Sequence, residues 1–167
     1  MSMDCTLYAA SLTLVRECTQ EPEEFIARLA ERVPDAKSLA LRKTWHCLHF
    51  VLSGTAWEGK QPLGFLVSGG QKISAPGDDE DEAYSPPRLL PPAFVKRLAK
   101  ALGAITTADF RKRFDLRRLS EAEIYPRIWN ESRTDLLREY QEAFKSLRQF
   151  VLESAERGDA IVVELCS

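Results

Sequence analysis

The chain has 167 residues, of which 44% are hydrophobic and 29% are charged, and its formal net charge at pH 7 is −2. These values are typical of one globular domain, residues 1–167, whose core buries roughly two-thirds of the unfolded surface. Basic residues alternate with acidic ones, so nucleic acid is not an expected partner. Because no apolar run approaches membrane-spanning length and the N-terminus has no basic leader, we expect a cytoplasmic protein without membrane segments.

The cysteines are far apart in the sequence and form no CxxC pair; they are Cys5, Cys18, Cys47 and Cys166. In a cytoplasmic protein such cysteines are expected to be reduced. The sequence therefore predicts no disulfide framework, and it contains no motif for a metal or a cofactor.

The first part of the chain predicts a strand followed by two helices. Thr6–Ala10 is short and apolar enough for a strand, and Ser11 stands where a helix cap is expected. Pro22 suits the first turn of the second helix, which carries core residues from Phe25 to Val33. A linker then leads to the central segment of the chain.

The central segment, Leu41–Gly54, reads LRKTWHCLHFVLSG and predicts a helix buried nearly all round. At about 100° per residue, Arg42, His46, His49 and Ser53 form one narrow polar stripe on this apolar rod. Buried polar groups need partners, so the stripe must face solvent, a cleft or other polar side chains. We expect Gly54 to end this helix in the left-handed conformation.

Two irregular or ambiguous stretches follow. Pro62–Gly70 fits either a strand or a short helix, and its initial proline and terminal glycines favour the helix. Ser74–Pro92 predicts an irregular segment containing the acidic run Asp78–Glu82, in which Asp79 and Glu80 are central. Like charges in a row repel one another, so we expect a solvated loop there.

The last part of the chain predicts helices and a final strand. We expect a helix from Pro91 or Pro92 to Gly103, short helices starting at the capping boxes Thr106-x-x-Asp109 and Ser120-x-x-Glu123, a long amphipathic helix from Ser132 to about Arg157, and a strand over Ala160–Leu165. The predicted fold is α+β and helix-rich, with a small sheet that includes the N- and C-terminal strands.

Several segments, taken together, resemble one bacterial family. Lys43–Gly54 is similar to the K-x-W-H-x-L-H-x-L-x-x-G segment of YfbM-like proteins, the domain of unknown function 1877. Matching segments follow in the same order, namely Pro62–Phe65 with Gly69-Gly70, Tyr84–Leu90 and Ala122–Trp129. Ala83 and Ser85 replace glycines that are common in the family around Tyr84. The resemblance implies an α+β cytoplasmic fold, no assigned reaction, and for some members a role as immunity proteins that neutralise a toxin.

Two interpretations of the polar residues stay open. Arg88 and Arg127 each follow a proline, and a guanidinium held at so rigid a position can bind a carboxylate in a fork geometry. In one interpretation these arginines, the histidine stripe and tyrosines such as Tyr84 form a buried network. In the other they form the floor of a shallow pocket. His46 and His49 have the spacing of two metal ligands, but without a third ligand nearby we expect hydrogen bonds instead of a metal.

We therefore carry two hypotheses on function. The first is a non-enzymatic protein-binding module, such as an immunity protein, whose acidic run around Asp79 and Glu80 contacts a basic partner such as a cognate toxin. The second is a small enzyme or ligand-binding protein that uses His46, His49 and Arg88. The sequence contains no catalytic triad, paired-carboxylate motif or cofactor fingerprint, so it favours the first. It leaves the oligomeric state open.

Overall fold

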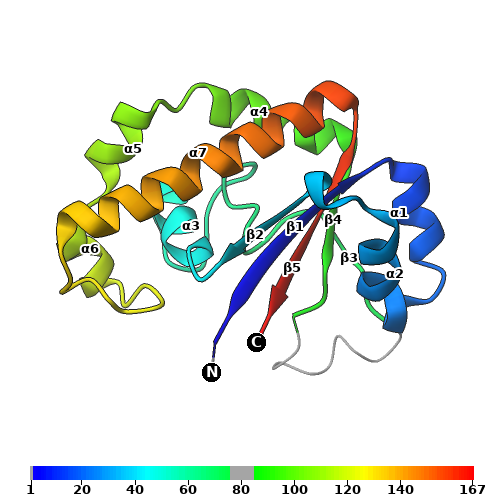
Figure 1. Cartoon of the computed structure of the whole chain (residues 1–167), viewed down its shortest axis with the longest axis horizontal. Helices are drawn as coiled ribbons and strands as arrows, with labels where there is room; N and C mark the ends of the chain where they lie inside the picture. The colour runs from blue at the N-terminus through cyan, green and yellow to red at the C-terminus, as the bar shows by residue number, and fades with distance from the viewer. Residues whose placement is uncertain (1, 76–84) are drawn as a thin grey trace.

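The computed structural model describes residues 2–75 and 85–167, and Figure 1 shows an antiparallel sheet between two unequal layers of helices. The strands are β1 (Asp4–Ala10), β2 (Ser38–Arg42), β3 (Gln71–Lys72), β4 (Arg88–Leu90) and β5 (Ala160–Cys166). The helices are α1 (Leu12–Cys18), α2 (Phe25–Arg32), α3 (Trp45–Ser53), α4 (Pro92–Gly103), α5 (Thr107–Arg113), α6 (Leu116–Glu121) and α7 (Arg133–Arg157), with single 3-10 turns η1 (Pro22–Glu24) and η2 (Asp35–Lys37). The predicted helix-rich α+β class is confirmed.

The two terminal strands pair at the centre of the sheet. β1 and β5 run antiparallel over seven residues each, from Asp4 opposite Cys166 to Ala10 opposite Ala160. The full strand order is β2-β1-β5-β4-β3. The prediction that the N- and C-terminal strands share one sheet is therefore confirmed.

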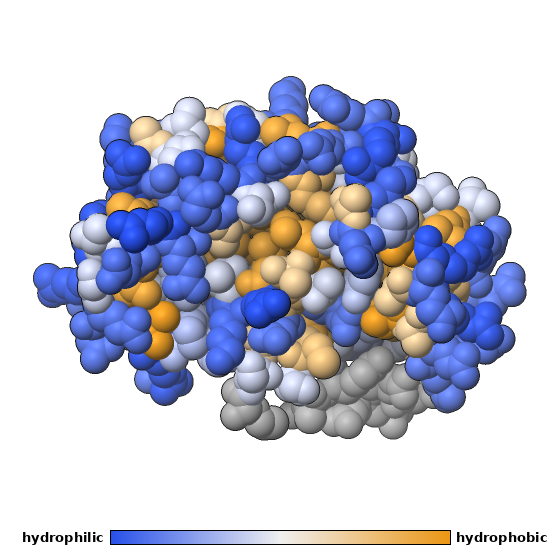
Figure 2. Space-filling view, viewed as in Figure 1, coloured by the Kyte–Doolittle hydropathy of each residue, from blue (hydrophilic) through white to orange (hydrophobic). Residues whose placement is uncertain are grey.

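Both faces of the sheet are buried, under two separate cores (Figure 1). Leu7, Ile161 and Val163 contribute to the larger core with α3–α7, whereas Ala160 and Val162 join the smaller core under α1 and α2. Because side chains alternate between the faces of a strand, a strand covered on both sides is apolar throughout. This explains the unbroken apolar run at the start of β5. Figure 2 shows apolar residues reaching the surface in the middle of the molecule, between the two helical parts.

Local capping signals place several helices where the sequence predicts them. The Ser11 hydroxyl accepts a hydrogen bond from the Leu14 amide at 3.2 Å and starts α1. Thr106 and Asp109 form a reciprocal capping box at α5, with bonds of 3.0 and 2.9 Å. α7 begins at Arg133, directly after Ser132 where the sequence predicts its start, although the Ser132 side chain makes no capping bond. No described helix is apolar enough over sufficient length to span a membrane.

The central helix is shorter than predicted. α3 begins at Trp45, and Leu41 and Arg42 belong to β2, which pairs with β1. Arg42 has a φ of 51°, so the backbone turns at the end of the strand and the residue does not lie on the histidine stripe. Pairing with a neighbouring strand overrides helical periodicity here. The predicted left-handed stop at Gly54 is confirmed by its φ of 83°.

Other predicted boundaries are also wrong. The segment 62–70 forms successive turns and is neither helix nor strand, because its hydrogen bonds are isolated ones such as Ser68 N–H to Gly64 O at 3.1 Å. Arg88–Leu90, predicted to be irregular, is the buried strand β4 between β3 and β5. Ser120 does not start a helix, since α6 begins at Leu116 with Asp115 as its cap.

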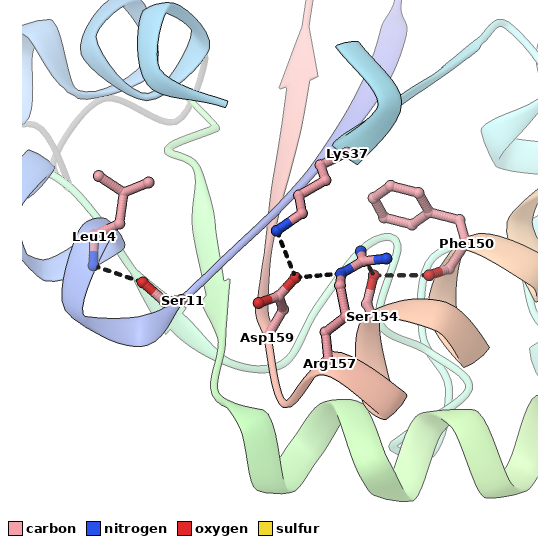
Figure 3. Close-up of polar contacts among 7 residues, drawn as sticks. All are labelled: Ser11, Leu14, Lys37, Phe150, Ser154, Arg157 and Asp159. Atoms are coloured by element: carbon pink, nitrogen blue, oxygen red, sulfur yellow. Dashed lines mark hydrogen bonds and ion pairs between the residues drawn. The ribbon is translucent and has the colours of Figure 1, made fainter. Parts of the chain in front are cut away.

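A buried carboxylate fixes the corner between α7 and β5 (Figure 3). One oxygen of Asp159 lies 2.9 Å from Arg157 Nε and 3.7 Å from Lys37 Nζ. The buried Ser154 hydroxyl donates to the Phe150 carbonyl at 2.7 Å. A buried charge must be paired to be tolerated, and here the pairing joins α7 and β5 to the η2 turn that leads into β2.

The two tryptophans at the start of α3 and in the following loop provide a matched test of the core. Trp45 is fully buried, whereas Trp57 is 59% exposed. We expect Trp45→Ala to lower the free energy of unfolding by about 3–5 kcal/mol, because the cavity left behind is not filled by neighbours. Trp57→Ala should lower it by about 1 kcal/mol or less. Urea denaturation of both variants checks this, and equal losses would contradict the central place of α3 in the core.

Candidate functional site

The first histidine of the predicted stripe is an internal hydrogen-bonding group. His46 is buried on α3, where its Nε2 lies 2.8 Å from the Ala56 carbonyl oxygen and its Nδ1 accepts the Tyr125 amide hydrogen at 3.0 Å. The Nδ1 contact requires an unprotonated nitrogen, so Nε2 carries the proton and donates to Ala56. Burial lowers the pKa of His46, against a smaller opposing effect of that carbonyl. The ring is therefore neutral and joins two irregular segments.

The second histidine is also enclosed. His49 is fully buried, and its Nε2 lies 3.2 Å from the Ser53 hydroxyl. Its Nδ1 has no hydrogen-bond partner within residues 2–75 and 85–167. Burial lowers the pKa of His49 to about 4, with a smaller opposing effect of the Glu58 backbone. His49 is thus neutral near pH 7.

Arg88 holds the turn segment against the sheet. Its guanidinium donates to the Phe65 carbonyl at 2.7 Å and to the Gly69 carbonyl at 2.9 Å, and the side chain is buried on β4. Burial lowers the pKa of Arg88 to about 10. Gly70 lies so close to β4 that a Cβ on it would be 2.4 Å from the Leu89 carbonyl oxygen. The carboxylate partner expected for Arg88 is absent from the described residues, and backbone carbonyls take its place.

Of the remaining predicted residues, the structure describes only Arg127. Arg127 is exposed and lies 3.9 Å from the Glu123 carboxylate, so it does not join the buried histidines. Tyr84, Asp79 and Glu80 lie outside the described residues. A direct binding role for the predicted residues stays a prediction.

An apolar pocket lies beside the two terminal strands, at the start of α3. It has a volume of about 490 Å³ and is lined by Met3, Trp45, Trp57, Val67, Ser85, Leu165, Cys166 and Ser167. Met3 and Trp45 form its floor and are held in place by hydrogen bonds. Trp45 Nε1 donates to the Met3 carbonyl at 3.0 Å, and the Met3 amide donates to the Tyr125 hydroxyl at 3.1 Å. The pocket therefore has a pre-formed apolar floor.

Trp57 forms the exposed wall of this pocket. Its ring centroid lies 4.3 Å from that of His46, which in turn stacks at 4.9 Å on Trp45. Among the described residues Trp57 is the one large hydrophobic side chain that is exposed. Trp57 is not among the site residues predicted from the sequence. The signal that could have indicated it was a tryptophan in the polar loop between Thr55 and Lys60.

The thiols divide into buried and exposed ones. Burial raises the pKa of Cys5 to about 12 and also raises that of Cys47, so neither is a ready nucleophile. Cys18 is buried as well, whereas Cys166 is exposed at the pocket. Within the described part of the chain, no group of three or more His, Cys, Asp or Glu side chains is arranged to hold a metal.

Comparison with known proteins identifies relatives but no reaction. A family model described as a domain of unknown function, DUF1877, matches residues 1–164. No curated protein matches the chain. The crystal structure of YfbM from Escherichia coli, a protein of unknown function, superposes with a TM-score of 0.73 at 18% identity, covering 98% of this chain and 99% of that one. This likeness shows a shared fold.

The buried histidines predict a pH-dependent stability. The pKa of His49 is about 4 in the folded protein against 6.5 for an ordinary histidine, so the unfolded chain binds more protons between these values and stability falls as the pH falls. From pH 7 to pH 5 we expect His49 to account for a loss of about 2 kcal/mol. Urea denaturation of the native protein and of His49→Phe at both pH values measures this difference. An identical pH dependence in the two proteins would show that His49 is already accessible to protons.

Proposed function

Because this chain belongs to the YfbM-like DUF1877 family, for which no reaction is established, we propose from its surface that it is a non-enzymatic protein-binding module. The observation that carries the proposal is the exposed Trp57 at the wall of a pre-formed apolar pocket. A basic protein, such as a cognate toxin neutralised by this chain, is the partner that we propose.

Trp57 has the properties of an interface anchor. Tryptophan is enriched among the few residues that supply most of the binding energy in protein interfaces. An exposed large apolar side chain is otherwise unfavourable in water, and here it lies beside Met3, Val67 and Leu165 in the pocket. Packing against the buried His46 ring restricts Trp57 before any partner arrives, which lowers the entropy lost on binding.

The contacts of the polar side chains also favour binding over catalysis. Both ring nitrogens of His46 are within hydrogen-bond distance of backbone groups, and Arg88 donates to two carbonyls. A small enzyme or ligand-binding protein that used His46, His49 and Arg88 would have to exchange these contacts for contacts to its ligand. Buried backbone groups left unpaired in this way would lower stability by about 1–3 kcal/mol each.

The proposed charge of the partner rests on the sequence. The acidic run Asp78–Glu82 precedes Ser85, a pocket residue, by a few positions. Five adjacent carboxylates attract a basic surface, and such attraction chiefly raises the association rate. The immunity role suggested by the family resemblance would require a partner of this kind.

The decisive test measures affinity after a partner has been identified by capture from source cells and purified. Trp57→Ala is expected to weaken binding by about 30-fold, the equivalent of about 2 kcal/mol. Lys145→Ala, on the exposed face of α7, is the control and should leave the dissociation constant unchanged. Replacing the five acidic residues by serine or asparagine should slow association, most strongly at low salt.

Cys166 offers a second readout of the same surface, because it is the exposed cysteine while Cys5, Cys18 and Cys47 are buried. The bound partner should protect Cys166 from N-ethylmaleimide, and prior modification should block binding. A partner that binds Trp57→Ala and the modified protein as tightly as the native chain would contradict the proposed surface. Turnover of a small molecule that is lost in His46→Ala would instead support the enzyme hypothesis.

A further inference from the structure

A second surface stands out by its charge. Residues 111–118 contain Arg111, Lys112, Arg113, Arg117 and Arg118 with one acid, Asp115, which gives this segment a charge of +4. The whole chain has a net charge of −2, so the rest of it carries −6. All five basic residues are exposed. Figure 1 shows the segment on α5 and α6, near the N-terminal end of α7 and away from α1 and α2.

The nearby carboxylates are already engaged. Asp109 accepts the Thr106 amide hydrogen in the capping box, and Asp115 accepts the Arg117 and Arg118 amide hydrogens at the start of α6. Glu121 pairs with Arg117 at 2.9 Å. By contrast, Arg113 and Arg118 form no ion pair with any described residue. Their guanidinium groups are therefore available to an anionic partner.

These two arginines line a small pocket at the C-terminal end of α3, where Phe50, Val51 and Leu52 are buried. Its volume is about 300 Å³, and the remaining lining residues are the last turn of α3 with its stop, Phe50–Gly54. The Arg118 guanidinium lies over the Phe50 ring, 5.5 Å from the centroid. Stacking on an aromatic face orients the guanidinium while its donor edges stay free for a carboxylate.

The geometry points to a docking surface for an acidic peptide segment of a partner protein. Carboxylates would bind Arg113 and Arg118 in the fork geometry that guanidinium groups favour. A nucleic acid fits less well, because phosphate binding needs a longer basic track, no aromatic platform is exposed here and the rest of the chain is acidic. None of the residues that line this pocket lines the Trp57 pocket, so the inference is independent of the function proposed above.

The test uses a fluorescein-labelled peptide in which glutamates alternate with leucines, titrated with the full chain and followed by fluorescence anisotropy. The double variant Arg113→Gln, Arg118→Gln should weaken binding by about tenfold or more. The control Arg16→Gln, Lys72→Gln removes the same charge from α1 and β3 and should weaken binding by less than about twofold. Trp57→Ala should bind the peptide like the native chain.

Three results would overturn the inference. The first is failure of the parent peptide to bind the native chain, which would show that this surface does not capture acidic segments. The second is an equal loss of affinity in the control variant, which would show non-specific charge attraction. The third is tighter binding of a single-stranded RNA oligonucleotide of equal charge, which would assign the surface to nucleic acid. Thermal unfolding of each variant confirms that these exposed substitutions leave the fold intact.

Discussion

The fold depends on buried polar side chains that satisfy the backbone of irregular segments. A buried amide or carbonyl without a partner is strongly unfavourable, and residues 54–70 and the segment between α6 and α7 have few regular hydrogen bonds of their own. His46 contacts the backbone of both regions, through Ala56 and Tyr125, and Arg88 holds the turns at Phe65 and Gly69. Side chains of the sheet and of α3 thereby hold loops whose own hydrogen bonds are too few to do so.

This constraint also decides where function can lie. Side chains whose polar atoms are hydrogen-bonded to backbone groups are poorly placed to bind a substrate. Exposed side chains at the surface, by contrast, can contact a partner. Trp57 rests on His46 and lines the apolar pocket, and Arg118 rests on Phe50 at the other end of α3. The same buried helix thus supports both surfaces, one apolar and one basic. Both surfaces fit the recognition roles that we propose for this chain.

Elements with strong local signals were predictable from the sequence. The capping box at Thr106, the length of α7 and the strands β1 and β5 follow from side-chain types that act within one turn or one strand. The pairing of β1 with β5 is long-range, and it was predictable because a strong strand signal stands at each end of the chain. β4, the end of β2 at Arg42 and the turns over 62–70 depend on partners distant in sequence, so periodicity misassigned them. The candidate site divides in the same way. The buried histidines of α3 were found, whereas the exposure of Trp57 emerges only when the loop is folded onto His46.

The most direct test of this account is the protonation state of His46. Nitrogen chemical shifts of labelled histidine report which ring nitrogen carries the proton and whether it titrates. We predict a neutral ring protonated on Nε2 whose titration midpoint lies below that of an ordinary histidine, because Nδ1 accepts the Tyr125 amide hydrogen and burial lowers the pKa of His46. A proton on Nδ1, or a titration midpoint near the ordinary value of 6.5, would contradict the structural role assigned to this residue.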